Sequence, residues 1–214
     1  MVATPRRKLL PFLMSKTRQA QIQRKTGETA ILVKLTVDGG GNSKIATGIP
    51  FFDHMLTLFA KHALFDLEVH AKGDIQVDFH HTVEDTGIVL GQALVKALGD
   101  KKGLVRYGNF HLPMDETLVR VALDFSGRPL LVWNAPKSFN LNRLKAGDFP
   151  AQLTVEFLRA FAQEAGLTLH VEVLYSSETH HLIEAVFKGL ARALEQAVRR
   201  DPRVHGIPST KGML

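Results

Sequence analysis

One short motif that could bind metal occurs twice in this chain, as His-His-x-x-Glu at positions 80–84 and 180–184. Its chemically capable members are His80, His81 and Glu84 in the first copy and His180, His181 and Glu184 in the second. Imidazole and carboxylate groups are the ligands that a first-row divalent metal accepts in a protein without cysteine. Two copies therefore predict two metal ions, or one site built by two halves.

The spacing of the motif predicts how it is used. On a helix, residues i and i+4 share a face, so His80 and Glu84 can reach the same ion, and the second copy repeats this arrangement. The adjacent histidine points about 100° away around the helix axis, so we expect each helix to serve two sites. Upstream, His54 aligns with Glu156, and both are metal-capable. The pattern is neither HExxH nor HxxEH, which disfavours a zinc peptidase and favours Mn or Fe.

The sequence around the motif repeats with it. Residues 54–63 match 156–165 and residues 78–98 match 178–198, both as helix patterns, while 65–73 and 167–175 match as strand patterns. Each half opens with alternating apolar and polar residues, which is typical of a strand hairpin, and we expect the turns at 26–27 and 126–127. The predicted fold is α+β: an internally duplicated unit, each half a mostly antiparallel sheet with two helices on one face. The helices of the two halves should pack together.

These patterns divide the chain into four segments. They are a basic N-terminal tail (1–17), a first repeat half (18–102), a second repeat half (103–200) and a Pro/Gly-rich C-terminal tail (201–214), with residues 99–112 as the junction.

The charge of the chain is concentrated at one end. The net charge is +6, but residues 1–25 hold seven Lys or Arg and no acid, which leaves 20 basic against 21 acidic residues elsewhere. A nearly neutral folded body argues against nucleic-acid binding. No apolar run reaches the roughly 18–20 residues that cross a bilayer, so we expect no membrane partner. The absence of cysteine is consistent with a cytoplasmic location.

Six ordered motifs make a resemblance specific. They are GIPFFDHML (48–56), DFHHTVEDTGIVLGQAL (78–94), RYGNFHLPMDE (106–116), DFSGRPLLV (124–132), THHLIEAVFKGLARAL (179–194) and STKG (209–212). From about Arg18 onward the chain resembles the imidazoleglycerol-phosphate dehydratases, which dehydrate D-erythro-imidazoleglycerol phosphate to imidazoleacetol phosphate in histidine biosynthesis. The resemblance implies two Mn ions per active site and a homo-oligomer of 24 subunits, with sites at subunit interfaces.

The resemblance also implies roles for individual residues. The metal ligands it implies are His54, His80, His81, Glu84, Glu156, His180, His181 and Glu184, although the position of Glu156 carries His in some relatives. The implied substrate contacts are Glu28, His54, His62, Arg106, Arg128, Lys188, Ser209, Thr210 and Lys211. The last three place the C-terminal tail in the active site. Arginine suits a phosphate through its bidentate fork, and lysine acts as a point charge.

The sequence leads to a hypothesis for the mechanism. Two metals would bind the nitrogens of the substrate imidazole and stabilise the imidazolate, whose electrons expel the C3 hydroxyl as water. A diazafulvene-like species would then lose the adjacent proton to give an enol. We expect Glu28, at the edge of a strand hairpin, to be the acid/base, with Glu84 and Glu184 as further catalytic carboxylates.

Three other functions remain open at this stage. A metal-binding or storage module would explain the duplicated ligands, but it gives no reason for Arg106, Arg128 or the Ser209-Lys211 tail. A nucleic-acid-associated protein would use the basic N-terminal tail. A different metal-dependent lyase on the same fold would be separated only by substrate tests.

Overall fold

Two four-stranded sheets, one from each half of the chain, form the outer layers of the computed structural model, which describes residues 17–136 and 139–214. In spatial order the first sheet contains β1 (Gln19–Lys25), β2 (Thr29–Thr36), β4 (Asp66–Gly73) and β3 (Ser43–Ala46). The second contains β5 (Tyr107–Met114), β6 (Thr117–Asp124), β10 (Thr168–Tyr175) and β7 (Leu130–Asn134). Both sheets follow the order first, second, fourth, third strand of their half, so the predicted fold of two similar halves is confirmed.

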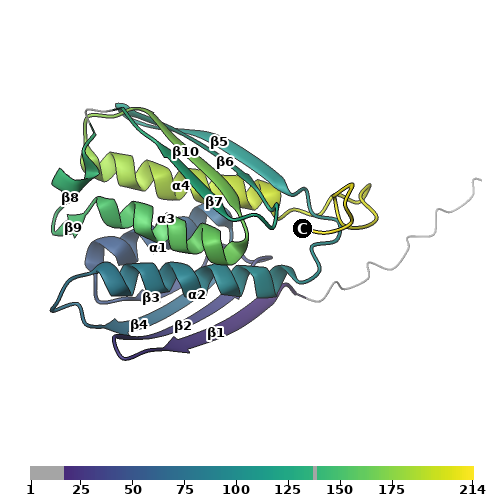
Figure 1. Ribbon diagram of the computed structural model, residues 1–214, viewed down its shortest axis with the longest axis horizontal. Coiled ribbons are helices and arrows are strands. Elements are labelled where there is room, and N and C mark those ends of the chain that lie inside the picture. Colours follow the sequence, from purple (N-terminus) through teal and green to yellow (C-terminus); the bar gives the residue numbers. More distant parts are fainter. Residues whose placement is uncertain (1–16, 137–138) are drawn as a thin grey trace, which may run out of the picture.

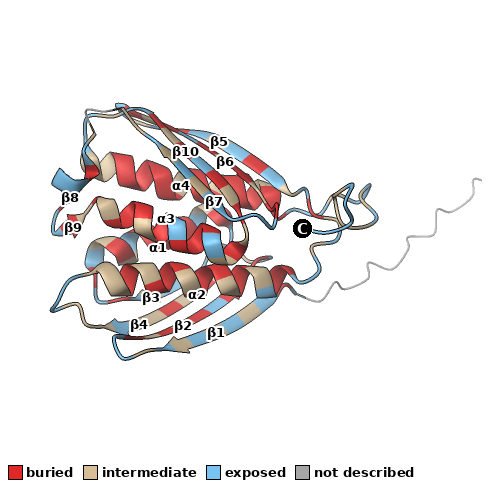
Figure 2. Cartoon of the chain, viewed as in Figure 1, coloured by how far each residue is buried: buried red, intermediate tan, exposed pale blue. Residues whose placement is uncertain are grey.

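The four α-helices of the described ranges fill the space between the sheets (Figure 1). They are α1 (Pro50–Ala63), α2 (His80–Leu98), α3 (Gln152–Ala165) and α4 (Thr179–Ala197). Helix α2 packs against α3 and α1 against α4, while α2 covers β1 and β2 and α4 covers β5 and β6. Buried residues gather on these helices and alternate with less buried residues along β2 and β6 (Figure 2). The predicted packing of helices from the two halves is therefore observed.

The packing between helices depends on aromatic rings and on glycine. Phe157 of α3 lies edge-on to Phe52 of α1 and stacks on Phe187 of α4, and all three are fully buried. Between α2 and α3 the backbones approach closely: a Cβ at Gly87 or Gly91 of α2 would lie 2.7 or 2.8 Å from a backbone carbonyl oxygen of α3. Because Gly87 and Gly91 lack a side chain, α2 of the first half can pack closely against α3 of the second.

Each sheet contains two antiparallel strand pairs and one parallel pair. The parallel pair is β3 with β4 in the first half and β7 with β10 in the second. A parallel pair needs a crossover, and α1 and α3 supply it. As a result α2, α3 and α4 all begin at the end of the molecule that carries β8 (Lys145–Ala146) and β9 (Phe149–Pro150), beside a short 3₁₀ turn at Leu141–Arg143 (Figure 1). We call this the helix-start end. The C-terminal tail lies at the opposite end.

The two predicted hairpins have different outcomes. The turn at 26–27 is confirmed by the antiparallel pair β1–β2, but the hairpin expected across 126–127 is wrong. Strand β6 pairs instead with β5 through a turn at Asp115 and Glu116, and β7 pairs with β10. Strand β5 begins inside the stretch expected to be a junction (99–112) and continues two residues past it to Met114. Gly108 and Pro113 weaken its strand pattern. Proline lacks the N–H of a central strand and is tolerated here because β5 is an edge strand.

No helix in the described ranges is long and apolar enough to cross a membrane. The basic N-terminal tail predicted at 1–17 falls, except for its last residue, outside the described residues.

Candidate active site

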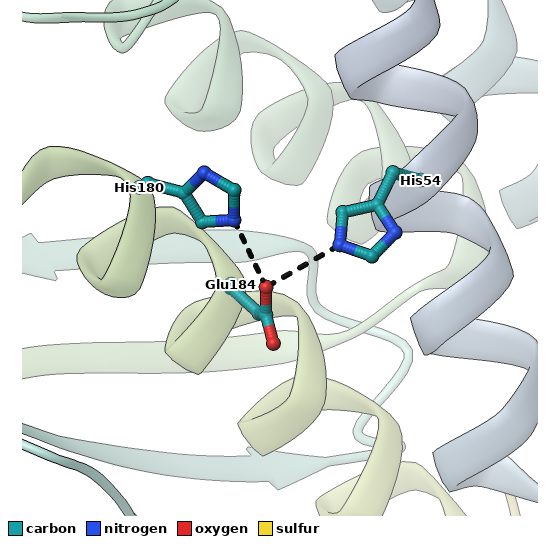
Figure 3. A group of neighbouring side chains, drawn as sticks. All are labelled: His54, His180 and Glu184. Carbon is teal, nitrogen blue, oxygen red and sulfur yellow. Dashed lines mark hydrogen bonds and ion pairs between the residues drawn. The ribbon is translucent and has the colours of Figure 1, made fainter.

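Three metal-capable side chains meet at the helix-start end where α1 packs on α4. His180 Nε2 lies 3.2 Å from Glu184 Oε2, and His54 Nε2 lies 3.4 Å from the same oxygen (Figure 3). The i,i+4 spacing places His180 and Glu184 on one face of α4, and α1 brings His54 to them from more than 120 positions away. The rings of His180 and Phe51 lie nearly perpendicular, with their centroids 5.1 Å apart. Two imidazoles thus converge on one buried carboxylate.

The carboxylate is held charged. Glu184 is only 7% exposed, and the Lys188 ammonium, one turn further along α4, lies 2.5 Å from Glu184 Oε1. Burial acts to raise the pKa of Glu184, but the bonds to Lys188 and His180 outweigh it, and the pKa lies below its usual value. His62 lies nearby, and burial together with the Lys188 charge lowers its pKa. Lys188 and His62, both expected to contact substrate, therefore border the same group.

The equivalent residues of the first motif are less tightly assembled. His80 Nε2 lies 3.5 Å from Glu84 Oε2 on α2, and both side chains are more than 40% exposed. Glu156 of α3 accepts a hydrogen bond from Gln152 Nε2 at 2.9 Å and pairs with Arg159. The structure thus assembles one three-residue group from the predicted ligands of a single chain, and it leaves the second as a His80–Glu84 pair and a separate Glu156.

The second histidine of each motif points elsewhere, as the 100° rotation predicts. His81 Nδ1 lies 3.0 Å from Asp74 Oδ2, and its Nε2 lies 3.8 Å from Glu28 Oε1. His181 Nδ1 lies 3.0 Å from Glu116 Oε2, and its Nε2 lies 4.0 Å from an Asp115 oxygen. These carboxylates raise the pKa of His81 and His181.

Sequence reasoning missed three of these carboxylates: Asp74, Asp115 and Glu116. The signal available for Asp115 and Glu116 was their place at the end of the RYGNFHLPMDE motif, and for Asp74 only its closeness in sequence to His81. A further carboxylate, Asp85, is buried beneath the β1–β2 turn. Asp85 lies on α2, contacts Arg24 Nη1 at 2.5 Å and accepts a hydrogen bond from the Thr29 hydroxyl. These contacts attach the β1–β2 turn, which carries Glu28, to α2.

Two expected substrate contacts, Arg106 and Arg128, lie with the C-terminal tail at the opposite end of the molecule. Arg106 donates to both oxygens of Asp124, at 2.6 and 3.0 Å, and to the Pro208 carbonyl at 2.7 Å, so it ties the C-terminal tail to the second sheet. Its backbone N–H bonds to the carbonyl of Ala197, the last residue of α4. From His180 to Ala197 the helix spans about 25 Å.

Other members of the expected phosphate site lie at the same end. Arg128 is exposed on the turn after β6 and donates to the Ser126 carbonyl oxygen. A Cβ on the neighbouring Gly127 would lie 2.7 Å from the carbonyl carbon of Leu214, so the chain end rests on this turn. The Ser209 hydroxyl accepts from the Lys211 N–H, and the Thr210 and Lys211 side chains are exposed. In one chain, Arg106, Arg128 and the C-terminal tail therefore do not meet the expected metal ligands, whereas Lys188 does.

The donors at the helix-start end fit a divalent metal ion. His54, His180 and Glu184 offer two imidazole nitrogens and a carboxylate oxygen within 4.8 Å of one another. Imidazole with carboxylate suits Mn, Fe, Zn and similar ions, and part of the group remains open to solvent, as a catalytic site requires. Such a set could polarise a bound ligand or hold a nitrogen heterocycle.

Comparisons with known proteins identify the family of this chain. The family model described as imidazoleglycerol-phosphate dehydratase matches residues 47–194. Proteins of that name from Thermoanaerobacter pseudethanolicus and Azorhizobium caulinodans are 60% and 59% identical to the chain. Each match covers 92% of this chain, and 100% and 98% of the respective relative.

Two solved structures are also similar to this chain. The crystal structure of imidazoleglycerol-phosphate dehydratase from Staphylococcus aureus subsp. aureus N315 is 42% identical with a TM-score of 0.76, covering 86% of this chain and 99% of that one. The enzyme from Pyrococcus furiosus is 37% identical with a TM-score of 0.75, covering 90% and 100%. Fold, motif content and similarity over nearly the whole length agree, and the chain belongs to the imidazoleglycerol-phosphate dehydratase family, the hydro-lyases that act in histidine biosynthesis.

Proposed function

We propose that this chain dehydrates D-erythro-imidazoleglycerol phosphate with two Mn²⁺ ions, in an active site assembled between subunits. The observation that carries the proposal is the convergence of His54 and His180 on the buried Glu184 carboxylate. By the internal repeat, His80, Glu84 and Glu156 would hold the second ion. His81 and His181, which point away from these groups, would complete sites with other subunits. When bound, such ions supply Lewis-acid stabilisation of negative charge on the substrate imidazole.

The separation of the charged groups supports a site shared between subunits. The metal-capable residues lie at the helix-start end, whereas Arg106 and the tail with Ser209 and Lys211 lie at the far end of α4, about 25 Å away. A substrate with an imidazole at one end and a phosphate at the other is too short to reach both within one chain. We infer that the tail of a second subunit reaches the helix-start end, which would make the active site part of a closed homo-oligomer, and 24 subunits is the assembly we propose.

Proton transfer in this proposal is assigned to Glu28. The reaction breaks the bond from C3 to its hydroxyl, which leaves as water after receiving a proton. It also breaks the adjacent C–H bond, whose proton passes to a base before the enol becomes a ketone. The Glu28 side chain is 58% exposed and lies 3.8 Å from His81 Nε2, so it is open to a substrate. The turn that carries it is ordered by hydrogen bonds from the Glu28 and Thr29 N–H groups to the Thr26 hydroxyl.

The first experiment measures dehydration by chelator-stripped protein before and after Mn²⁺ is added. Activity that appears only with Mn²⁺, with about two ions bound per subunit, would support the proposal, and Glu28→Gln should abolish turnover while keeping the metal. Uptake of metal without turnover would favour a storage module. Turnover by metal-free protein would refute the metal-dependent mechanism.

The second experiment tests whether the site is shared between subunits. Glu184→Gln damages the helix-start end and Lys211→Ala damages the tail, so each variant alone should be nearly inactive. If one site takes its metal ligands and its tail from different subunits, co-expression in equal amounts restores about a quarter of the sites, since each intact part is present half the time. A site contained in a single chain would recover no activity.

A further inference from the structure

The second histidine of each motif makes the same contact with a carboxylate that the ligand set does not include. His81 Nδ1 lies 3.0 and 3.2 Å from the two oxygens of Asp74, and His181 Nδ1 lies 3.0 and 3.3 Å from those of Glu116. In both cases the Nδ1 atom faces the carboxylate with both oxygens in reach. The contact thus occurs once in each half of the chain.

The two carboxylates do not correspond within the internal repeat. Asp74 follows β4, in the loop before α2, whereas Glu116 lies in the turn between β5 and β6. The counterpart of Glu116 in the first half is Glu28, since each directly precedes the threonine that opens the second strand of its hairpin, Thr29 or Thr117. The same carboxylate–Nδ1 contact is therefore made by residues at non-equivalent positions in the two halves. The internal repeat alone does not account for it.

The arrangement has a definite effect on the imidazole. A carboxylate that accepts the Nδ1 proton holds the ring in the tautomer whose lone pair is on Nε2, orients the ring, and makes Nε2 more basic. In both histidines Nε2 is the atom that points away from the Nδ1 carboxylate, and both side chains are about one-third exposed. Among the described residues, each Nε2 is thus left without a direct hydrogen bond and partly exposed, 3.8 Å from Glu28 Oε1 in His81 and 4.0 Å from Asp115 Oδ2 in His181, where it could bind a metal ion.

We propose that Asp74 and Glu116 are positioning residues for His81 and His181. As a consequence, the two carboxylates in the hairpin turns, Glu28 and Glu116, have different roles. Glu116 is committed to His181. Glu28, its counterpart, stays free for proton transfer because Asp74 orients His81 in its place. The inference rests on the proposed metal-dependent function, and it explains why two halves with the same ligands would supply only one acid/base.

The first test measures Mn²⁺ binding directly, without turnover. Mn²⁺ is titrated into chelator-stripped full-length protein, and free Mn²⁺ is counted by electron paramagnetic resonance. Asp74→Asn and Glu116→Gln should each weaken binding about 10- to 100-fold while the number of ions bound at saturation stays the same. Glu28→Gln should lose turnover with its Mn²⁺ affinity unchanged. Unchanged affinity in Asp74→Asn and Glu116→Gln would overturn the inference.

A matched control lies one residue from Glu116. Asp115 is 80% exposed, lies 4.0 Å from the Nε2 atom of His181 and not at its Nδ1 atom, and has a positive φ of 48° that asparagine tolerates. Asp115→Asn should therefore lower Mn²⁺ affinity much less than Glu116→Gln does, and it should leave the proton on His181 Nδ1. An equal loss in Asp115→Asn and Glu116→Gln would show that only the negative charge of the turn matters, and it would refute an orienting role.

A second test does not depend on metal and separates this inference from the proposed function. In metal-free protein with ¹⁵N-labelled histidine, magic-angle-spinning NMR at alkaline pH reports which ring nitrogen carries the proton. His81 and His181 should be protonated at Nδ1, and each should lose that preference in its own variant, Asp74→Asn or Glu116→Gln. Protonation at Nε2 in the unmodified chain would refute the inference even if Mn²⁺ binds. Correct tautomers in a protein that binds no Mn²⁺ would sustain the orientation and refute the metal proposal.

Discussion

Replacing Asp85 should disturb stability and catalysis together, because this buried side chain joins α2 to the hairpin that carries Glu28. Asp85→Asn keeps the shape and leaves an acceptor for the Thr29 hydroxyl, but it removes the charge that faces Arg24 at 2.5 Å. Breaking a fully buried ion pair costs about 3–5 kcal/mol, and an exposed pair contributes roughly 0–1 kcal/mol. The Asp85 side chain is 11% exposed and that of Arg24 34% exposed, so the pair lies between these limits.

The expected loss is about 1–3 kcal/mol of unfolding free energy. For a chain of this size that corresponds to a fall in Tm of about 2–4 °C for each kcal/mol. If the turn moves by about 1 Å, the acid/base is misplaced and kcat should fall roughly 10- to 100-fold. Thermal unfolding and steady-state kinetics on saturating substrate measure the two effects separately.

Asp38→Asn is the matched control. Asp38 pairs with Arg18 at the other end of the same two strands, with its side chain 47% exposed. This variant should lower stability slightly and leave kcat unchanged. If Asp85→Asn lowers Tm but not kcat, the hairpin does not need Asp85 to place Glu28. If both variants lower kcat alike, general destabilisation explains the loss.

Three further predictions concern packing, the tail and acid stability. Gly91→Ala should destabilise the fold by about 1–2 kcal/mol in urea unfolding, because its Cβ would lie 2.8 Å from a backbone oxygen of α3. Gly206→Ala, where a Cβ would meet nothing within 4 Å, should be nearly neutral. Asp124→Asn should loosen Arg106 and the tail it holds, so the KM for substrate should rise with little change in kcat, and limited proteolysis should cut the tail faster. The Arg18 guanidinium beside Asp38 lowers the pKa of that carboxyl. The ion pair therefore stabilises the fold fully above about pH 4, and this stabilisation is lost as the pH falls through the lowered pKa of the folded state. The urea midpoints of the unmodified chain and of Asp38→Asn should differ at neutral pH and converge in acid.

Local patterns in the sequence were sufficient for much of the fold. The helices expected from the repeated stretches 78–98 and 178–198 are observed as His80–Leu98 and Thr179–Ala197, because the 3.6-residue period of buried positions is a property of each segment alone. Strand β5 was missed because its glycine and proline hide the alternation, and it is a strand only because β6 lies beside it. The hairpin predicted across 126–127 was wrong for a similar reason, because strand pairing depends on the rest of the fold: β7 pairs with β10, and not with β6.

The sequence by itself determined the kinds of ligand, their helical spacing and the duplication, because residue type and local period do not depend on the rest of the chain. Tertiary structure alone decided which groups meet. It brought His54 to His180 and Glu184 through the packing of α1 on α4, and it set Asp74 and Glu116 against the two outer histidines. It also placed Arg106 and the tail at the far end of α4. Such contacts depend on how distant segments pack, and no local pattern records that.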